Sequence, residues 1–327
     1  MKVAQLLEVR RQNWTELERL CDELSLKRRR SLSAATVTRF SDLYRAACAD
    51  LALADSYNLP PETVQYLHQL VGRAHNQLYR SRPFDMATWG QVLLYDVPQS
   101  IFRDRCVHVA FAVFWGIFIL SAILAYSRTL WPTYAEDVLG EASIMQLEEN
   151  FRDPLSDRPY SVNMFMAAFY ISHNTGIGLK CFAGGLLIVP GLFITIFNAG
   201  HLGASFGYMA RPDIEQGKNF FEFVTAHGPF ELTAIVLSAG AGLRLGISYL
   251  STKGMTRADS LALARREAMP VMGAAIVLFV LAAFTEAFIS PTSLPYFVKA
   301  GVAVIDSGLL MFYFVVLGFP RRRPDAA

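Results

Sequence analysis

The chain has 327 residues, of which 53% are hydrophobic and only 18% are charged, and its mean hydropathy is +0.30. Soluble globular domains carry about 25% charged residues, so this composition excludes an ordinary soluble protein over the whole length. The net charge of +2 is too small to indicate nucleic acid as a partner. Four widely separated cysteines predict neither a disulfide set nor a zinc site, and we expect no cofactor.

Residues 1–102 have the composition of a soluble helical region. Apolar residues recur there at helical spacing in three stretches, 6–24, 33–57 and 64–78. Ser33 suits the N-cap of the second helix, and Pro60-Pro61 ends that helix. The basic run 27–30 is either a solvated loop or a contact with anionic lipid. We predict a cytoplasmic helical domain over 1–102, which ends in an interfacial helix near 89–101.

Six apolar stretches follow, and about 20 helical residues are needed to cross a hydrocarbon core of ~30 Å. The stretches are 107–126, 162–177, 181–209, 230–250, 271–290 and 296–319. The second is short, so only five spans result if it merely dips into the outer interface. We therefore predict an all-α polytopic membrane protein with about six, alternatively five, transmembrane helices over 103–327.

The distribution of charge predicts the orientation of these spans. Arg103, Arg105, the basic residues of 253–266 and the arginines of 321–323 lie next to span ends, and such clusters face the cytoplasm. The loop 127–159 carries seven acidic residues and should be extracytoplasmic. We expect a multi-pass protein with both termini in the cytoplasm.

Two G-x-x-x-G patterns, 203–207 and 242–246, predict close helix packing. Small residues let helix backbones approach one another where lipid supplies no hydrophobic drive. The packing can be within the chain or between chains. A homodimer formed through these two faces is our hypothesis.

Ionisable side chains inside spans cost about 2.5–3.5 kcal/mol on insertion scales and often mark function. The polar intramembrane residues are His201, His227, Glu231, Arg244, Glu286 and Asp306. With six spans, most of them fall toward the outer half, whereas Arg244 falls near the inner end and Asp306 near mid-depth. His227 and Glu231 are four residues apart and share one helix face if the helix begins at His227.

Four interpretations of these residues stay open. The first is structural, with a buried Glu231 hydrogen-bonded to backbone and to His227. The second is a divalent metal site made by His227, Glu231 and either His201 or Glu286. The third is a proton or ion pathway, and the fourth is a contact surface for a partner or lipid. The chain contains no H-E-x-x-H or G-x-S-x-G motif, so an intramembrane protease has little support, and we favour the structural interpretation.

Four stretches form a recognisable set of motifs: Phe169-x-x-x-His173-Asn174, 197–203, His227-Gly228-Pro229-Phe230-Glu231-Leu232 and Gly242-Leu243-Arg244-Leu245-Gly246. Together they resemble the stage II sporulation protein M superfamily. The family-motif positions of this chain are His173, Asn174, Asn198, Gly200, Gly228, Gly242 and Gly246. Two positions depart from the pattern: His173 replaces the first Asn of a pair, and Ala199 separates Asn198 from Gly200. The N-terminal segments are similar to the version found in non-sporulating bacteria.

The resemblance implies a non-enzymatic, integral protein of the bacterial inner membrane. In spore formers such proteins help to assemble a complex with cell-wall hydrolases that drives membrane migration during engulfment. In non-sporulating relatives the usual neighbours are MoxR-type AAA ATPases and von Willebrand factor A-type proteins. We therefore expect a scaffold or a membrane-remodelling or envelope-assembly component, whose partners are membrane lipid and envelope-assembly proteins or a MoxR-type ATPase system.

Two other functions compete with this expectation. A transporter or ion channel would use Glu231, Glu286 and Asp306 as an intramembrane acidic path. A metal-dependent enzyme would carry stoichiometric metal.

Overall fold

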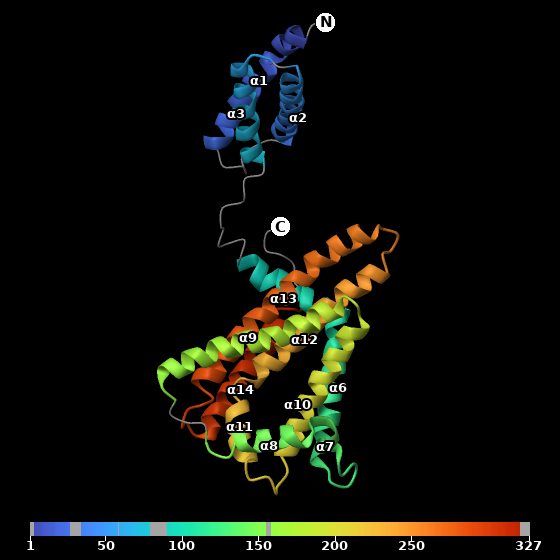
Figure 1. The fold of residues 1–327 in the computed structure, drawn as a ribbon, viewed down its shortest axis with the longest axis vertical. Coiled ribbons are helices and arrows are strands. Elements are labelled where there is room, and N and C mark those ends of the chain that lie inside the picture. The colour runs from blue at the N-terminus through green and yellow to red at the C-terminus, as the bar shows by residue number, and fades with distance from the viewer. Residues whose placement is uncertain (1–2, 27–33, 58, 79–89, 155–157, 321–327) are drawn as a thin grey trace. The chain divides into compact units, whose positions relative to one another are not determined.

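A computed structural model describes residues 3–26, 34–57, 59–78, 90–154 and 158–320, and these ranges contain helices and no strand. The chain divides into two compact units, residues 1–86 and 87–327 (Figure 1). The second unit begins before the predicted boundary at 102, because the described residues 90–103 pack within it. The basic run 27–30, Ser33, Trp89 and the arginines of 321–323 lie outside the described residues.

The first unit is a bundle of three helices. They are α1 (Val3–Leu26), α2 (Ala34–Ser56) and α3 (Pro61–Leu78), and each packs against the other two. Their apolar faces bury a core that includes Leu17, Phe40 and Leu67. The buried carboxylate of Asp50 accepts a hydrogen bond from Trp14 Nε1 at 2.9 Å. The three predicted helices of this region are therefore present.

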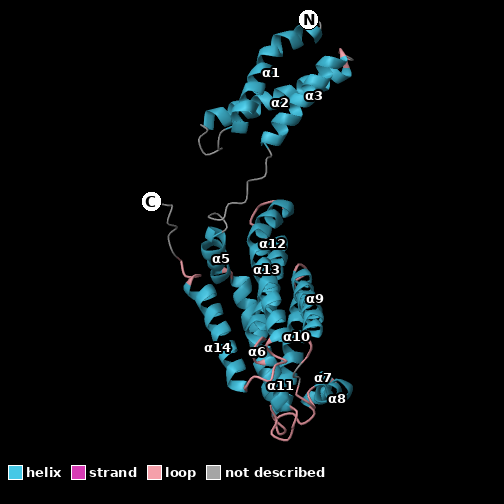
Figure 2. Cartoon of the chain, turned by 90° about the vertical axis from the view of Figure 1, so that its left-hand side faces the viewer, coloured by secondary structure: helices cyan, strands magenta, loops and turns pink. Residues whose placement is uncertain are grey.

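The second unit opens with a π-helical turn, η2 (Val92–Asp96), that runs into α5 (Val97–Arg103). The helices that follow are α6 (Arg105–Tyr126), α7 (Tyr134–Leu139), α8 (Glu141–Asn150), α9 (Tyr160–Gly185), α10 (Val189–Met209), α11 (Gly217–Val224), α12 (Gly228–Leu250), α13 (Arg257–Phe288), α14 (Tyr296–Met311) and η3 (Phe312–Val316). At its centre, α12 packs against five others, α6, α9, α10, α13 and α14 (Figure 2).

Five described helices are long and apolar enough to cross a membrane: α6, α10, α12, α13, and α14 continued through η3. The all-α polytopic fold is thus confirmed. At 26 residues, α9 has sufficient length but is not among the five. It nevertheless lies along α12, since Gly178 meets Ser238 and Gly185 meets Gly242. The helix α9 therefore runs along the bundle beside the five apolar helices, as a sixth long helix.

Two predicted boundaries were wrong, and one predicted loop contains helices. The break expected near 177–181 lies at 186–188, where Ile188 has a positive φ of 59°, because docking on α12 keeps α9 helical to Gly185. The stretch expected at 271–290 begins at Arg257 and passes through Pro270, so most of the basic loop 253–266 is helix. The acidic loop 127–159 contains α7 and α8.

The two ends of the helical bundle differ in what they contain. Phe102 contacts Phe319, and Tyr313 donates a hydrogen bond to the carbonyl of Leu93, so the beginning and the end of the second unit lie together. The opposite end holds α7, α8 and α11 (Figure 1). The acidic segment is therefore separated from both chain ends of this unit.

Candidate functional site: a buried cluster at the start of α12

His227 and Glu231 lie on one face of the first turn of α12. His227 is the N-cap, and Pro229 fits the first turn because its missing N–H has no helical partner there. The backbone N–H of Glu231 donates to the carbonyl of His227 at 3.2 Å. His227 Nε2 and Glu231 Oε2 are 3.7 Å apart. The local sequence thus places the imidazole beside the carboxylate, as the four-residue spacing predicts.

Glu286 of α13 and Asn174 of α9 complete the cluster. One ligand atom from each of His227, Glu231 and Glu286 lies within 4.8 Å of the others. Asn174 Nδ2 donates to Glu286 Oε2 at 3.4 Å. The side chains of His227 and Glu231 are only 6% and 18% exposed, and Glu286 and Asn174 are buried. Three helices therefore deliver polar groups to one apolar location.

A second set of contacts lies on the Nδ1 side of the imidazole. His227 Nδ1 and Ser290 Oγ are 2.9 Å apart, and Ser290 is the second residue after the end of α13. Lys299 of α14 is buried and donates through Nζ to the carbonyl of Ser290 at 2.7 Å. Arg158, just before α9, interacts electrostatically with Glu286. Nε2 of the imidazole is consequently left facing the carboxylates.

The other predicted site residues do not join this cluster. His201 of α10 stacks on Phe197 with ring centroids 5.9 Å apart, and its Nδ1 is buried without a hydrogen-bond partner among the described residues. Asp306 of α14 is buried, and its Oδ2 lacks such a partner within the described ranges. Of the two third ligands considered, His201 and Glu286, the structure brings Glu286 to the pair.

Arg244 belongs to a separate ionic cluster near the C-terminal end of α12. Its Nη1 lies 2.9 Å from Oδ2 of Asp104, and its Nη2 pairs with Glu267 of α13. Asp104 also caps α6, since its Oδ1 accepts the backbone N–H of Cys106 at 2.8 Å. Our sequence reasoning missed Asp104, although an Asp directly before an apolar run is an N-cap signal.

The family-motif positions divide into core-facing and surface-facing residues. Asn174 is buried in the cluster, whereas its neighbour His173 is exposed and stacks on Phe169. Asn198 Nδ2 donates to the carbonyl of Ile194 in its own helix. The carbonyl of Gly200 accepts Ser121 Oγ at 2.6 Å, which ties α10 to α6. A side chain added at Gly228 would meet open space.

Both G-x-x-x-G faces are used inside the chain. Gly203 and Gly207 lie against the backbone carbonyls of Phe118 and Ala122 in α6. Gly242 and Gly246 lie against carbonyls of α9, and a Cβ at any of the four would collide with backbone. The hypothesis that these faces form a homodimer interface was therefore wrong, since α6 and α9 already occupy them.

The His227–Glu231–Glu286 cluster has a defined chemical capacity. Two carboxylates this close in an apolar interior cannot both be charged unless a cation lies beside them. Without a cation, at least one of them has to be protonated. A neutral imidazole accepts a proton or a metal ion through Nε2. The arrangement can thus share protons or bind a divalent cation.

The two units match different family models. A family model described as "Stage II sporulation protein M" matches residues 107–291, more than half of the chain, and this range includes the buried cluster. A second model, described as "Domain of unknown function (DUF8413)", matches residues 4–80 of the first unit. No curated protein and no solved structure matches the chain. By the match over 107–291, the chain belongs to the stage II sporulation protein M family.

Proposed function

We propose that this protein is a non-enzymatic scaffold of the bacterial inner (cytoplasmic) membrane that takes part in envelope assembly or membrane remodelling. Membership of the stage II sporulation protein M family supports an integral membrane role of this kind. The five apolar helices support a multi-pass arrangement.

The observation that carries the proposal is the way in which glycines join the helices. Gly207 brings α10 onto α6, Gly242 brings α12 onto α9, and Gly240 meets the backbone of Val107 in α6. Backbone contacts of this kind leave little room for helices to slide or rock, as alternating access in a transporter requires. A rigid block suits a protein that holds others in place.

The proposed orientation follows from charge. Arg103, Arg105 and the basic residues at the start of α13 lie near the end that also contains η3, and Lys/Arg clusters favour the cytoplasm. The acidic segment with α7 and α8 then faces outward. Both chain termini are cytoplasmic in this proposal.

The proposed partners are lipid, envelope-assembly proteins or a MoxR-type ATPase system, and a second copy of the chain. Large exposed apolar side chains on α9, α10 and α14 support lipid contact, among them Phe165, Phe193 and Phe297. A homodimer remains part of the proposal, but its interface has to lie on faces other than the two glycine pairs.

Ion flux in proteoliposomes tests the scaffold against a channel. We expect wild-type protein to give no more proton or cation flux than protein-free liposomes. A flux that is present in the wild type and disappears in Glu231→Gln would overturn the scaffold proposal. Glu267→Gln, which alters an acid outside the His227 cluster, is the matched control.

The second candidate is an ion or proton pathway, and the pairing of Glu231 with Glu286 in the interior favours it. The position of Asp306 counts against it. Asp306 lies on α14 and is not one of the residues gathered with Glu231 and Glu286. A pathway would need the three acids in a continuous polar line.

A further inference from the structure

We propose that His227, Glu231 and Glu286 form a binding site for a divalent transition metal, best represented by Zn²⁺, that fastens α12 to α13. The proposal does not depend on the scaffold function. It begins from the fact that three metal-ligating side chains from two helices converge in the interior of the second unit.

The distances are close to those that a metal requires. Ligand atoms about 2.1 Å from a tetrahedral zinc ion lie about 3.4 Å from one another. His227 Nε2 and Glu231 Oε2 are already 3.7 Å apart, and the Glu286 oxygen lies within 4.8 Å of both. Side-chain rotation alone can close this gap. The fourth position stays open for water.

The surrounding contacts match those of protein metal sites. A metal-bound histidine normally holds its other ring nitrogen in a hydrogen bond, and ligating carboxylates are themselves hydrogen-bonded. Ser290 Oγ provides the first contact, with His227 Nδ1, and Asn174 provides the second, with Glu286. Nε2 therefore faces the carboxylates with its orientation fixed, which is the geometry that metal binding needs.

Charge favours a divalent cation over an empty cluster. Arg158 interacts electrostatically with Glu286, and this attraction offsets only part of the charge of the two carboxylates. A divalent ion would stabilise the remaining charge, so that neither carboxylate has to be neutralised by a proton. The imidazole nitrogen disfavours Mg²⁺ and Ca²⁺, which take oxygen ligands, and favours later transition metals such as Zn²⁺.

A polar cavity lies beside Ser290, the residue that contacts the imidazole. This cavity, of about 210 Å³, is lined by Ser290, Lys299, Asn219 and Glu222 among others. Ser290 connects this cavity to the imidazole through its hydrogen bond to Nδ1. The cavity and the cluster are therefore separated by the side chain of Ser290, which contacts both.

Metal content of the purified full-length protein tests the proposal. The protein in detergent is stripped with EDTA, re-equilibrated with Zn²⁺, dialysed and analysed by elemental mass spectrometry. We expect about one zinc per chain in the wild type, as a site with three protein ligands binds a single ion. We expect loss of that zinc in His227→Gln, Glu231→Gln and Glu286→Gln.

Asp306→Asn is the matched control, because it removes a buried membrane carboxylate that lies outside the cluster. It should retain zinc. The proposal is overturned if the wild type binds no more zinc than the three cluster variants.

X-ray absorption on the zinc-loaded wild type keeps the proposal testable if the cluster variants do not fold. Nitrogen and oxygen scatterers at about 2.0–2.2 Å support the site. Sulfur scatterers overturn it, since the zinc would then sit on the free cysteines Cys21, Cys48, Cys106 or Cys181.

Discussion

Asn174 and His173 are neighbours on α9 and have opposite environments. Asn174 is 3% exposed and donates a hydrogen bond to Glu286, whereas His173 is exposed and stacks on Phe169. The departure of this chain from the family pattern at His173 therefore falls on the outer face of α9. It leaves the contacts of the buried cluster unaltered.

Substitution of these two residues should have different effects on stability. Asn174→Ala removes a hydrogen-bond donor from the buried carboxylate of Glu286, which should lower the free energy of unfolding by about 1–3 kcal/mol. His173→Ala changes a surface residue and should stay within about 0.5 kcal/mol. Denaturant unfolding in detergent micelles measures both. Equal losses would contradict the assigned burial.

Gly242 offers a second test at a single position. A Cβ there would collide with the backbone of Phe182, so Gly242→Ala should destabilise the protein by about 1–3 kcal/mol. Gly176 in α9 has open space around it, and Gly176→Ala should be neutral or stabilising by up to about 1 kcal/mol. Thermal unfolding of the two variants compares them directly. A Gly242→Ala protein as stable as the wild type would show that α9 and α12 are not in backbone contact.

At the scale of elements, α9 shows how tertiary contacts override a local pattern. The polar run 173–176 resembles the end of a span, yet the helix continues through it to Gly185. Helical geometry points successive residues to different faces, so Asn174 turns inward while His173 turns outward. Close docking of Gly178 and Gly185 on neighbouring helices then holds the last two turns in place.

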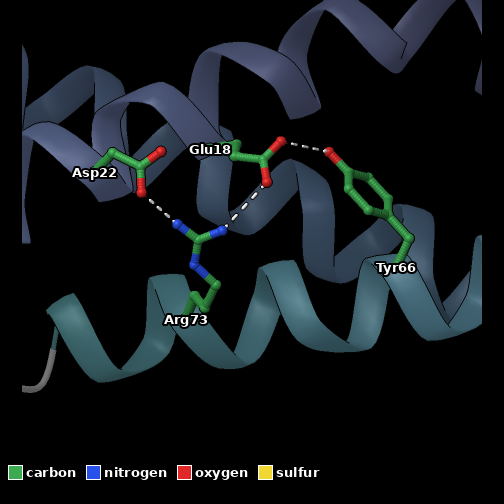
Figure 3. A network of polar contacts seen from close by, with 4 residues as sticks. All are labelled: Glu18, Asp22, Tyr66 and Arg73. Atoms are coloured by element: carbon green, nitrogen blue, oxygen red, sulfur yellow. Dashed lines mark hydrogen bonds and ion pairs between the residues drawn. The ribbon is translucent and has the colours of Figure 1, made fainter.

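The first unit is joined by polar contacts between its helices as well as by its core. Arg73 of α3 pairs with Asp22 of α1 at 2.5 Å and with Glu18 at 3.2 Å (Figure 3). Tyr66 donates its hydroxyl to Glu18 at 3.3 Å. Burial, together with the charge of Glu18, raises the pKa of Tyr66 above its ordinary value.

This raised pKa predicts a loss of stability at alkaline pH. The folded bundle holds the phenol proton more tightly than the unfolded chain, so the contribution is complete below about pH 10 and is lost as pH rises through the folded pKa. Tyr66→Phe should show a smaller loss between about pH 9 and 12. Circular dichroism of residues 1–86 during denaturation measures it. Tyr57→Phe, at an exposed position, should lose as much stability as the wild type.

At the scale of the whole molecule, the proposed orientation, with α9 as a crossing helix, predicts which loops are reachable from outside. Met145 of α8 and Met255 of the loop before α13 are both exposed. The helix α8 and the connection between α12 and α13 lie at opposite ends of the bundle (Figure 1). In a chain whose native cysteines are replaced, Met145→Cys should react with a membrane-impermeant maleimide on intact cells. Met255→Cys should react only after permeabilisation. Labelling of both variants on intact cells would mean that α9 does not cross, and labelling of Met255→Cys alone would mean that the proposed orientation is reversed.

Properties that depend on residues close together in sequence were determined by the sequence alone. Apolar length predicted the long apolar helices, Pro60-Pro61 and helical spacing predicted the three-helix first unit, and the four-residue spacing predicted that His227 faces Glu231. Family motifs identified the membrane unit before the match over 107–291 confirmed it. These features arise from local geometry and solvation, which a single stretch of chain carries by itself.

Only the tertiary structure decided which distant residues meet. Glu286 joins His227 and Glu231, whereas His201 and Asp306 stand apart and Arg244 pairs with Asp104. The rotation and depth of each helix set these contacts, and both depend on which glycine faces dock on which neighbour. Identical G-x-x-x-G spacing permits packing within a chain or between chains, so the sequence could not show that α6 and α9 occupy those faces.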